Sequence, residues 1–139
     1  MACLDTSLLI DLCRRNPARR LPAREKLREL GRRGETLAVT RLNIAELLVG
    51  MFRSRDPVRE RRSIETVLRG LEILEFTDRA SLVFARMTAH LQEIGKPAGD
   101  MDVLIAATAI SSGHSIVVTR NPKHFANLPG VIVESYVHE

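Results

Sequence analysis

Residues 99–119 read GDMDVLIAATAISSGHSIVVT, and this stretch predicts a helix that is followed directly by a β-strand. The helix is expected to begin near the two aspartates and to stop at Gly113, a residue that favours helix C-termini. The run SIVVT is rich in β-branched residues, and the segment after it contains Pro122, which favours a loop. Helix and strand in immediate succession are typical of an α/β unit.

The same alternation extends over the rest of the chain. Strands are expected in MACLD at the start and in residues 36–40, 71–76 and 131–136, with helices between them. Alternating strands and helices favour a parallel sheet covered on both faces. The predicted fold class is α/β: an α/β/α sandwich whose central parallel sheet has about five strands. The length suits a single domain over residues 1–139.

The composition favours an anionic partner. The net charge is +4 and the pI is about 9.7, which points first to nucleic acid. Aromatic residues make up only 4% of the chain and Trp is absent, so a base-stacking platform is not expected. We read no secretory leader and no bilayer-spanning apolar run, so we expect a cytoplasmic protein with no membrane partner.

Two acidic residues stand apart from other charges. Asp5 follows the first strand, and open parallel sheets bind ligands outside the carboxyl ends of their strands. Asp5 could instead help to cap the next helix, although Thr6 and Ser7 can already do so. Glu46 is the only ionisable residue in the apolar run LNIAELLVGM, so it requires a polar partner, a cation or an exposed edge.

The two aspartates of the opening stretch have different expected roles. Asp100 is well placed as the N-cap of the helix, and capping alone would explain it. Asp102 lies in the first turn, where the helix dipole favours an anion. At helical spacing it shares a stripe with Ile105 and Ala109, which should pack inward. Asp102 is therefore expected to face the top of the sheet, toward Asp5.

Polar residues also follow the predicted strand of residues 115–119. Thr119 ends this strand, and Asn121 is either a turn residue before Pro122 or a neutral oxygen donor to a metal-bound water. Three carboxylates with such neighbours form an oxygen-rich site that suits Mg²⁺ or Mn²⁺. A divalent ion there can polarise a phosphodiester and generate hydroxide from water.

Four segments together resemble the landmarks of the PIN-domain ribonucleases. They are LDTSLLIDL, TRLNIAELLVG, GKPAGDMDVLIAATA and VVTRNPKHF, and they span nearly the whole chain in the familiar order. Within that family the chain is most similar to the VapC toxins of bacterial toxin–antitoxin pairs. The resemblance implies a PIN-like sandwich, a Mg²⁺-dependent endoribonuclease that also accepts Mn²⁺, and an RNA substrate, often tRNA. It also implies a homodimer and a cognate antitoxin that covers the active-site groove.

The resemblance assigns roles to individual residues. The motif positions of the family fall on Asp5, Glu46 and Asp102, which are expected to hold the metal. The expected supporting residues are Asp100 as an auxiliary acid, Thr6 or Thr119 as the polar group that orients the site, and Asn121. The family often has Asp where Asn121 stands, so the resemblance does not imply a second tightly held metal.

Basic residues crowd the first two predicted helices and the region of residues 53–62. About half of them should be solvated or paired with Glu on helix faces, and the others could hold phosphates. Arg120, next to the proposed site, is the best single candidate for an RNA phosphate contact.

Two alternatives to this enzyme remain open. The chain could be a nucleic-acid or protein-binding module on the same fold, with weak or no catalysis. A histidine ribonuclease is also possible in principle, although His90, His114 and His138 show no pairing and His124 is only expected in a loop near the site. Metal-activated water would leave 5′-phosphate ends, whereas attack by the 2′-hydroxyl would leave a cyclic phosphate. A nucleotide-binding domain is disfavoured because no glycine-rich loop follows the first strand.

Overall fold

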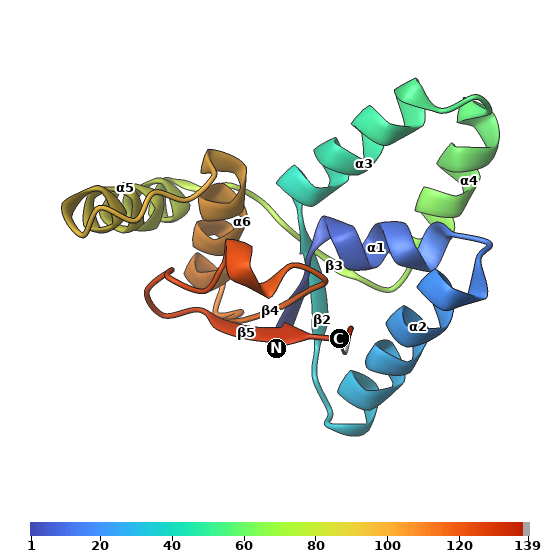
Figure 1. Cartoon of the computed structure of the whole chain (residues 1–139), viewed down its shortest axis with the longest axis horizontal. Coiled ribbons are helices and arrows are strands. Elements are labelled where there is room, and N and C mark those ends of the chain that lie inside the picture. The colour runs from blue at the N-terminus through green and yellow to red at the C-terminus, as the bar shows by residue number, and fades with distance from the viewer. Residues whose placement is uncertain (138–139) are drawn as a thin grey trace.

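A computed structural model describes residues 1–137 of the chain (Figure 1). Its sheet has five parallel strands in the order β3-β2-β1-β4-β5. The strands are β1 (Ala2–Leu4), β2 (Leu37–Thr40), β3 (Glu72–Leu74), β4 (Ile116–Thr119) and β5 (Ile132–Ser135). The predicted α/β class and the number of strands are therefore confirmed.

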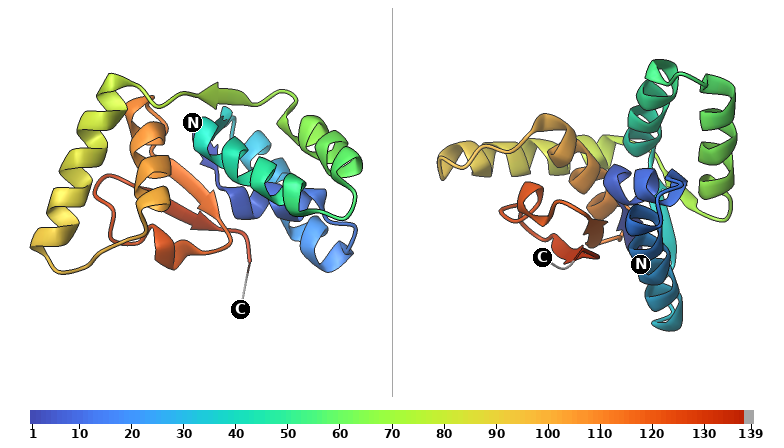
Figure 2. Two further views of the ribbon diagram at one scale, coloured as in Figure 1. Left: turned by 90° about the horizontal axis from the view of Figure 1, so that it is seen from above. Right: turned by 45° about the vertical axis from the view of Figure 1, so that its right-hand side comes forward.

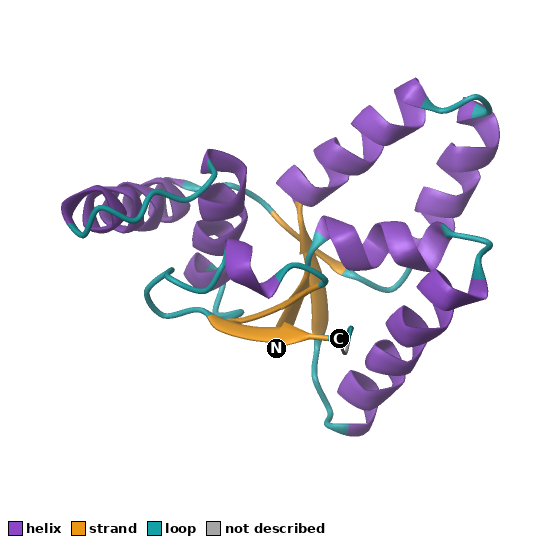
Figure 3. Cartoon of the chain, viewed as in Figure 1, coloured by secondary structure: helices purple, strands orange, loops and turns teal. Residues whose placement is uncertain are grey.

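Helices cover both faces of this sheet, as Figures 2 and 3 show. They are α1 (Thr6–Cys13), α2 (Pro17–Arg32), α3 (Arg41–Arg53), α4 (Pro57–Leu68), α5 (Asp78–Glu93) and α6 (Asp100–Ser111), with a short 3₁₀ helix η1 (Pro122–His124). Helices α1 to α4 contact one another on one side, and α5 packs against α6 on the other. Within residues 1–137, no helix is long and apolar enough to cross a membrane.

The strands point alternate side chains into two separate apolar clusters. Leu4 and Val118 belong to the cluster beneath α1, α2 and α3, whereas Val117 belongs to the cluster beneath α5 and α6. Because both faces of the central strands are buried, β1 and β4 are almost continuously apolar, as expected for a parallel sheet. The polar residues at the ends of these strands are then fixed in place by the packed core.

Two of the predicted helix caps are wrong. Helix α6 has Gly99 as its N-cap, and Asp100 is already the first helical residue and makes no capping bond. Helix α1 has Asp5 at its N-cap position, again without a side-chain capping bond. The physical reason at α1 is competition, because the Thr6 hydroxyl bonds to Glu46 of α3 and the Ser7 hydroxyl contacts Asp5 and Thr119 instead.

Candidate active site

The carboxyl ends of β1, β2 and β4 meet at one edge of the sheet. From β1 the sheet continues through β2 to β3 on one side, and from β4 it continues to β5 on the other. The point between β1 and β4, where the strand order reverses, is where open α/β sheets bind ligands. Asp5 lies directly after β1, and Thr119 is the last residue of β4. The short strands and the helices that follow them therefore bring residues more than 100 positions apart in the sequence together.

Asp5 is held firmly by neighbouring hydroxyls. Its side chain is buried, and Oδ2 accepts hydrogen bonds from Thr119 Oγ1 at 2.8 Å and from Ser7 Oγ at 3.2 Å. The other oxygen, Oδ1, has only a long contact of 3.5 Å with Asn43 Nδ2. Asp5 therefore presents one well-anchored oxygen and one oxygen with capacity for a further ligand.

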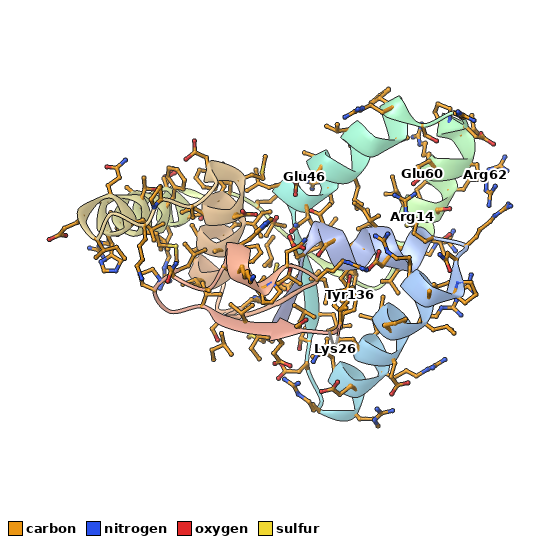
Figure 4. The ribbon with its side chains drawn as sticks, in the orientation of Figure 1. Arg14, Lys26, Glu46, Glu60, Arg62 and Tyr136 are labelled. Atoms are coloured by element: carbon orange, nitrogen blue, oxygen red, sulfur yellow. The ribbon has the colours of Figure 1, made fainter. Side chains whose placement is uncertain are left out.

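Glu46 projects from α3 and is labelled in Figure 4. Its Oε1 accepts a hydrogen bond of 2.6 Å from Thr6 Oγ1, so the residue that follows Asp5 also contacts the second acid. Glu46 is half-buried, and the expectation that it is not a freely solvated surface residue is met.

Asn43 is a buried residue of this edge that the sequence reading missed. Its Nδ2 donates to Thr6 Oγ1 at 2.9 Å, and its Oδ1 accepts from the backbone N–H of Thr40 at 3.0 Å. Thr40 and Asn43 form a reciprocal capping box at the start of α3. The pattern Thr-x-x-Asn before the apolar run was a signal for the cap, but its contact with Thr6 depends on the tertiary fold.

Asp102 lies in the first turn of α6 and is partly buried, with 25% of its side chain exposed. Its Oδ2 lies 3.6 Å from His124 Nδ1, so the loop after β4 reaches this carboxylate. A side chain at position 99 would place its Cβ only 3.2 Å from Asp102 Oδ2, which shows how closely the chain passes there. Ile105 and Ala109 are buried as predicted.

The carboxylates affect one another electrostatically. Burial, together with the charges of Asp5 and Asp102, raises the pKa of Glu46, although the hydrogen bond from Thr6 opposes this shift. Burial and the charge of Asp5 also raise the pKa of Asp102, while His124 opposes it. We call Asp5, Glu46 and Asp102 the acidic edge. Repulsion within such a set favours binding of a proton or a cation.

The acidic edge fits a divalent cation in chemistry but is not closed around one. All its donors are carboxylate oxygens, the ligands that Mg²⁺ and Mn²⁺ prefer. Among residues 1–137, however, no three His, Cys, Asp or Glu side chains are grouped closely enough to form a metal site by themselves. Mg²⁺ commonly retains several waters and uses one or two carboxylates, so the donor set remains compatible with it.

Two other predicted residues lie at the margin of this edge. Asp100 is exposed at the start of α6. Asn121 is also exposed, and its backbone N–H donates to Thr119 Oγ1 at 3.0 Å. Asn121 therefore contacts the threonine that anchors Asp5 through its backbone and not through the side-chain oxygen considered from the sequence.

Arg120 has a buried partner. Its Nη1 lies 2.9 Å from Oδ2 of the fully buried Asp11, which also binds Arg19 and accepts a 2.6 Å hydrogen bond from Tyr136. The backbone N–H of Arg120 donates to Ser7 Oγ at 3.0 Å. An RNA phosphate would have to share this guanidinium with a buried carboxylate.

A parallel sheet of this order, with Asp5 after β1, Glu46 on α3 and Asp102 on α6, matches the PIN domain. The model of that family fits residues 2–131, which include the whole acidic edge. The chain therefore belongs to the PIN-domain family and, within it, to the VapC ribonucleases, as its relatives show.

Ribonuclease VapC2 of Haemophilus influenzae is 31% identical over 134 residues, 96% of each chain. A tRNA(fMet)-specific endonuclease VapC of Salmonella typhimurium is 30% identical over 72% of this chain and 75% of its own. Among solved structures, VapBC2 from Rickettsia felis, bound to a promoter DNA fragment, has a TM-score of 0.85 at 25% identity and covers 96% of this chain and 97% of its own. VapBC-5 from Mycobacterium tuberculosis, described as a toxin–antitoxin system, has a TM-score of 0.66 at 27% identity and covers 96% of both chains. The resemblance read from the sequence is confirmed at the level of the family.

Proposed function

We propose that this chain is an endoribonuclease toxin that hydrolyses phosphodiester bonds of RNA at the acidic edge. The observation that carries the proposal is the approach of three carboxylates from three distant segments at the switch point of a PIN-type sheet. Such a set is electrostatically unfavourable by itself, and a cation that neutralises it supplies the chemistry the reaction needs. The names of the related ribonucleases support RNA as the substrate.

The proposed cation is Mg²⁺, with Mn²⁺ as a substitute, because the donors are oxygens only. When bound, it would polarise the scissile phosphodiester and lower the pKa of a water molecule. Asp5 is the proposed direct ligand, since Thr119 and Ser7 orient its carboxylate and Oδ1 retains free capacity. Glu46 and Asp102 are the proposed second and third acids, bound directly or through water.

The surrounding polar residues have positioning roles in this proposal. Thr6 orients Glu46 through its 2.6 Å hydrogen bond, and Thr119 orients Asp5. Asp100 adds negative charge at the start of α6 as an auxiliary acid. Asn121 keeps the Thr119 hydroxyl in place through its backbone N–H.

The proposed partners follow from the similar complexes. VapBC assemblies pair a toxin with an antitoxin, and the fold of this chain matches them over nearly its full length. We therefore propose a cognate antitoxin and a homodimeric toxin. A tRNA is the favoured substrate because one relative is named for tRNA(fMet).

The test is to incubate the purified protein with total RNA in Mg²⁺, in Mn²⁺ or in chelator, and to sequence the cut ends. We expect cleavage only with metal, and 5′-phosphate with 3′-hydroxyl ends. Cyclic phosphate ends would indicate attack by the 2′-hydroxyl and refute the proposed chemistry. Binding of RNA without cleavage under every metal condition would instead favour a binding module on the same fold.

A further inference from the structure

The end of α1 that lies away from the acidic edge borders an open cavity of about 340 Å³. The connection to α2, α2 itself and α4 contribute basic side chains to it, and Figure 4 labels two of them, Arg14 and Arg62. Hydroxyl groups of Ser63 and Thr66 also line the cavity. We call its basic residues the arginine pocket: Arg14, Arg15, Arg20, Arg59 and Arg62.

The arginines of this pocket lack acidic partners within residues 1–137. Elsewhere in the chain arginines do pair with carboxylates, as Arg33 does with Glu134 and Arg41 with Glu75. The buried Nε of Arg20 has no hydrogen-bond acceptor among the described residues. Guanidinium groups that share one cavity repel one another, and a buried N–H without an acceptor is unfavourable. Both features would be relieved by an anion in this cavity.

A second cavity of about 180 Å³ connects the arginine pocket with the acidic edge. It shares the lining residues Cys13 and Arg14 with the first cavity, and Glu46 with the acidic edge. Glu60 also lines it, so the positive charge is concentrated at the far end. Helix α1 runs along this path, and its eight residues span about 12 Å. A polyanion bound at the acidic edge can therefore continue along α1 to the arginines.

The chemistry of the pocket favours phosphate. Guanidinium groups present planar pairs of donors that match phosphate oxygens, and the two hydroxyls add further donors. The chain has few aromatic residues and no Trp, so it offers little surface for base stacking. An RNA strand would have to be held mainly through its phosphates.

We infer that the arginine pocket binds a backbone phosphate of the RNA at a distance from the scissile bond, and that it determines affinity for the strand. The inference rests on the proposed function, since it takes RNA as the substrate. It is separate from Arg120, which is bound to Asp11 on another side of α1.

The test measures RNA binding without cleavage. A labelled single-stranded RNA is titrated with protein, and its fluorescence anisotropy reports binding. The proteins compared are the Asp5→Asn parent and the same parent that also carries Arg20→Gln/Arg62→Gln. The matched control is Arg79→Gln/Arg86→Gln, which removes the same charge from exposed arginines of α5. We expect the pocket variant to bind at least about tenfold more weakly at low salt. Its salt dependence should fall by about 0.7 in the log–log slope, the change expected for one lost phosphate contact on a single strand.

The control variant should bind as the parent does, and circular dichroism should show that both variants are folded. Equal affinity and equal salt slope for the two double variants would overturn the inference. Unchanged RNA binding with lost antitoxin binding would also overturn it, and would assign the pocket to the protein partner. Cleavage by the chain with native Asp5 is measured in parallel, so that a failure of the proposed function is recognised separately.

Discussion

At the scale of single residues, the acidic edge consists of carboxylates that the fold keeps partly away from water. Thr119 and Ser7 anchor Asp5, and Thr6 anchors Glu46, so hydroxyls rather than lysines or arginines satisfy these acids. Neutral donors orient a carboxylate without cancelling its charge. The acids therefore remain able to attract a cation.

Glu46→Gln should make the metal-free protein more stable at neutral pH. Because the pKa of Glu46 is raised above its ordinary value of 4.5, the folded protein holds this proton more tightly than the unfolded chain does. That stabilisation is present below pH 4.5 and is lost as the pH rises through the raised pKa. Thermal denaturation in chelator should show a higher melting temperature for the variant at pH 7 and little difference at pH 4. A variant that melts lower than the native protein at both pH values would contradict this.

Asp100→Asn and Asp102→Asn should differ in metal response. The charge of Asp5 raises the pKa of Asp102, so these two carboxylates interact, whereas Asp100 is exposed and makes no capping bond. Without a capping role, loss of the Asp100 charge should cost only about 0.3–1 kcal/mol of helix-dipole interaction. Mn²⁺ at a hundredfold excess over its dissociation constant should stabilise the Asp100 variant by about 2.7 kcal/mol, and the Asp102 variant much less. A thermal-shift titration measures both values. Greater Mn²⁺ stabilisation of the Asp102 variant than of the Asp100 variant would show that Asp100, and not Asp102, binds the metal.

From the sequence we predicted the three acids of the proposed site and two of the hydroxyls that contact them, Thr6 and Thr119, but not every residue that orients them. Asp5 and Glu46 were recognisable because a charge beside or within an apolar run requires a partner. Asn43 and Ser7 were missed because their hydrogen bonds connect positions that only the folded sheet brings together. A local pattern cannot specify such long-range partners.

At the scale of helices and strands, the sequence predicted the order of elements well, but it gave the wrong N-caps for α1 and α6. The strands are short runs of apolar residues on a sheet buried on both faces, so their signal is strong and local. Capping residues have polar side chains that also serve tertiary contacts. At α1 the Thr6 hydroxyl bonds to Glu46 and not to the backbone of its own helix, so the helix has no side-chain cap.

Strand β5 depends on an ion-pair network that should give the protein an acid-sensitive stability. Glu134 binds Arg33 at 2.7 Å and the buried Lys26 at 2.9 Å, and these bonds lower the pKa of Glu134 to about 2. A lowered pKa stabilises the fold above the ordinary value of 4.5, and this contribution is lost as the pH falls toward 2.

Glu134→Gln should therefore lower the free energy of unfolding by about 1–2 kcal/mol at pH 7. Urea denaturation curves of the variant and the native protein should converge between pH 4.5 and pH 2. The control Glu65→Gln breaks only the exposed Arg61 pair and should cost less than about 0.5 kcal/mol. A Glu134 variant as stable as this control at pH 7 would show that the network contributes little.

At the scale of the whole molecule, Asp11 joins the two ends of the chain. Its buried carboxylate binds Arg19 of α2, Arg120 after β4 and Tyr136 near the C-terminus. Burial opposes ionisation, but hydrogen bonds from these three residues outweigh it and hold the pKa of Asp11 below its ordinary value.

Asp11→Ala should cost about 2–3 kcal/mol, because it leaves the buried Tyr136 hydroxyl without its acceptor and removes the ion pairs of the partly exposed Arg19 and Arg120. Tyr136→Phe removes a single hydrogen bond and should cost only about 1 kcal/mol. Urea denaturation of the two variants measures this difference. Equal losses would indicate that Asp11 contributes no more than its bond to the tyrosine.

The acidic edge as the centre of RNA hydrolysis is tested most directly by the cleavage rate of Asp5→Asn in Mn²⁺. The matched control is Glu65→Gln, which removes one carboxylate from an exposed face of α4. The substitution at Asp5 keeps an oxygen that can accept from Thr119, so the fold and melting temperature in chelator should be retained. We predict that Asp5→Asn cleaves RNA no faster than a protein-free control, while Glu65→Gln cleaves at the native rate. Cleavage by Asp5→Asn at the native rate would contradict the assignment of the acidic edge.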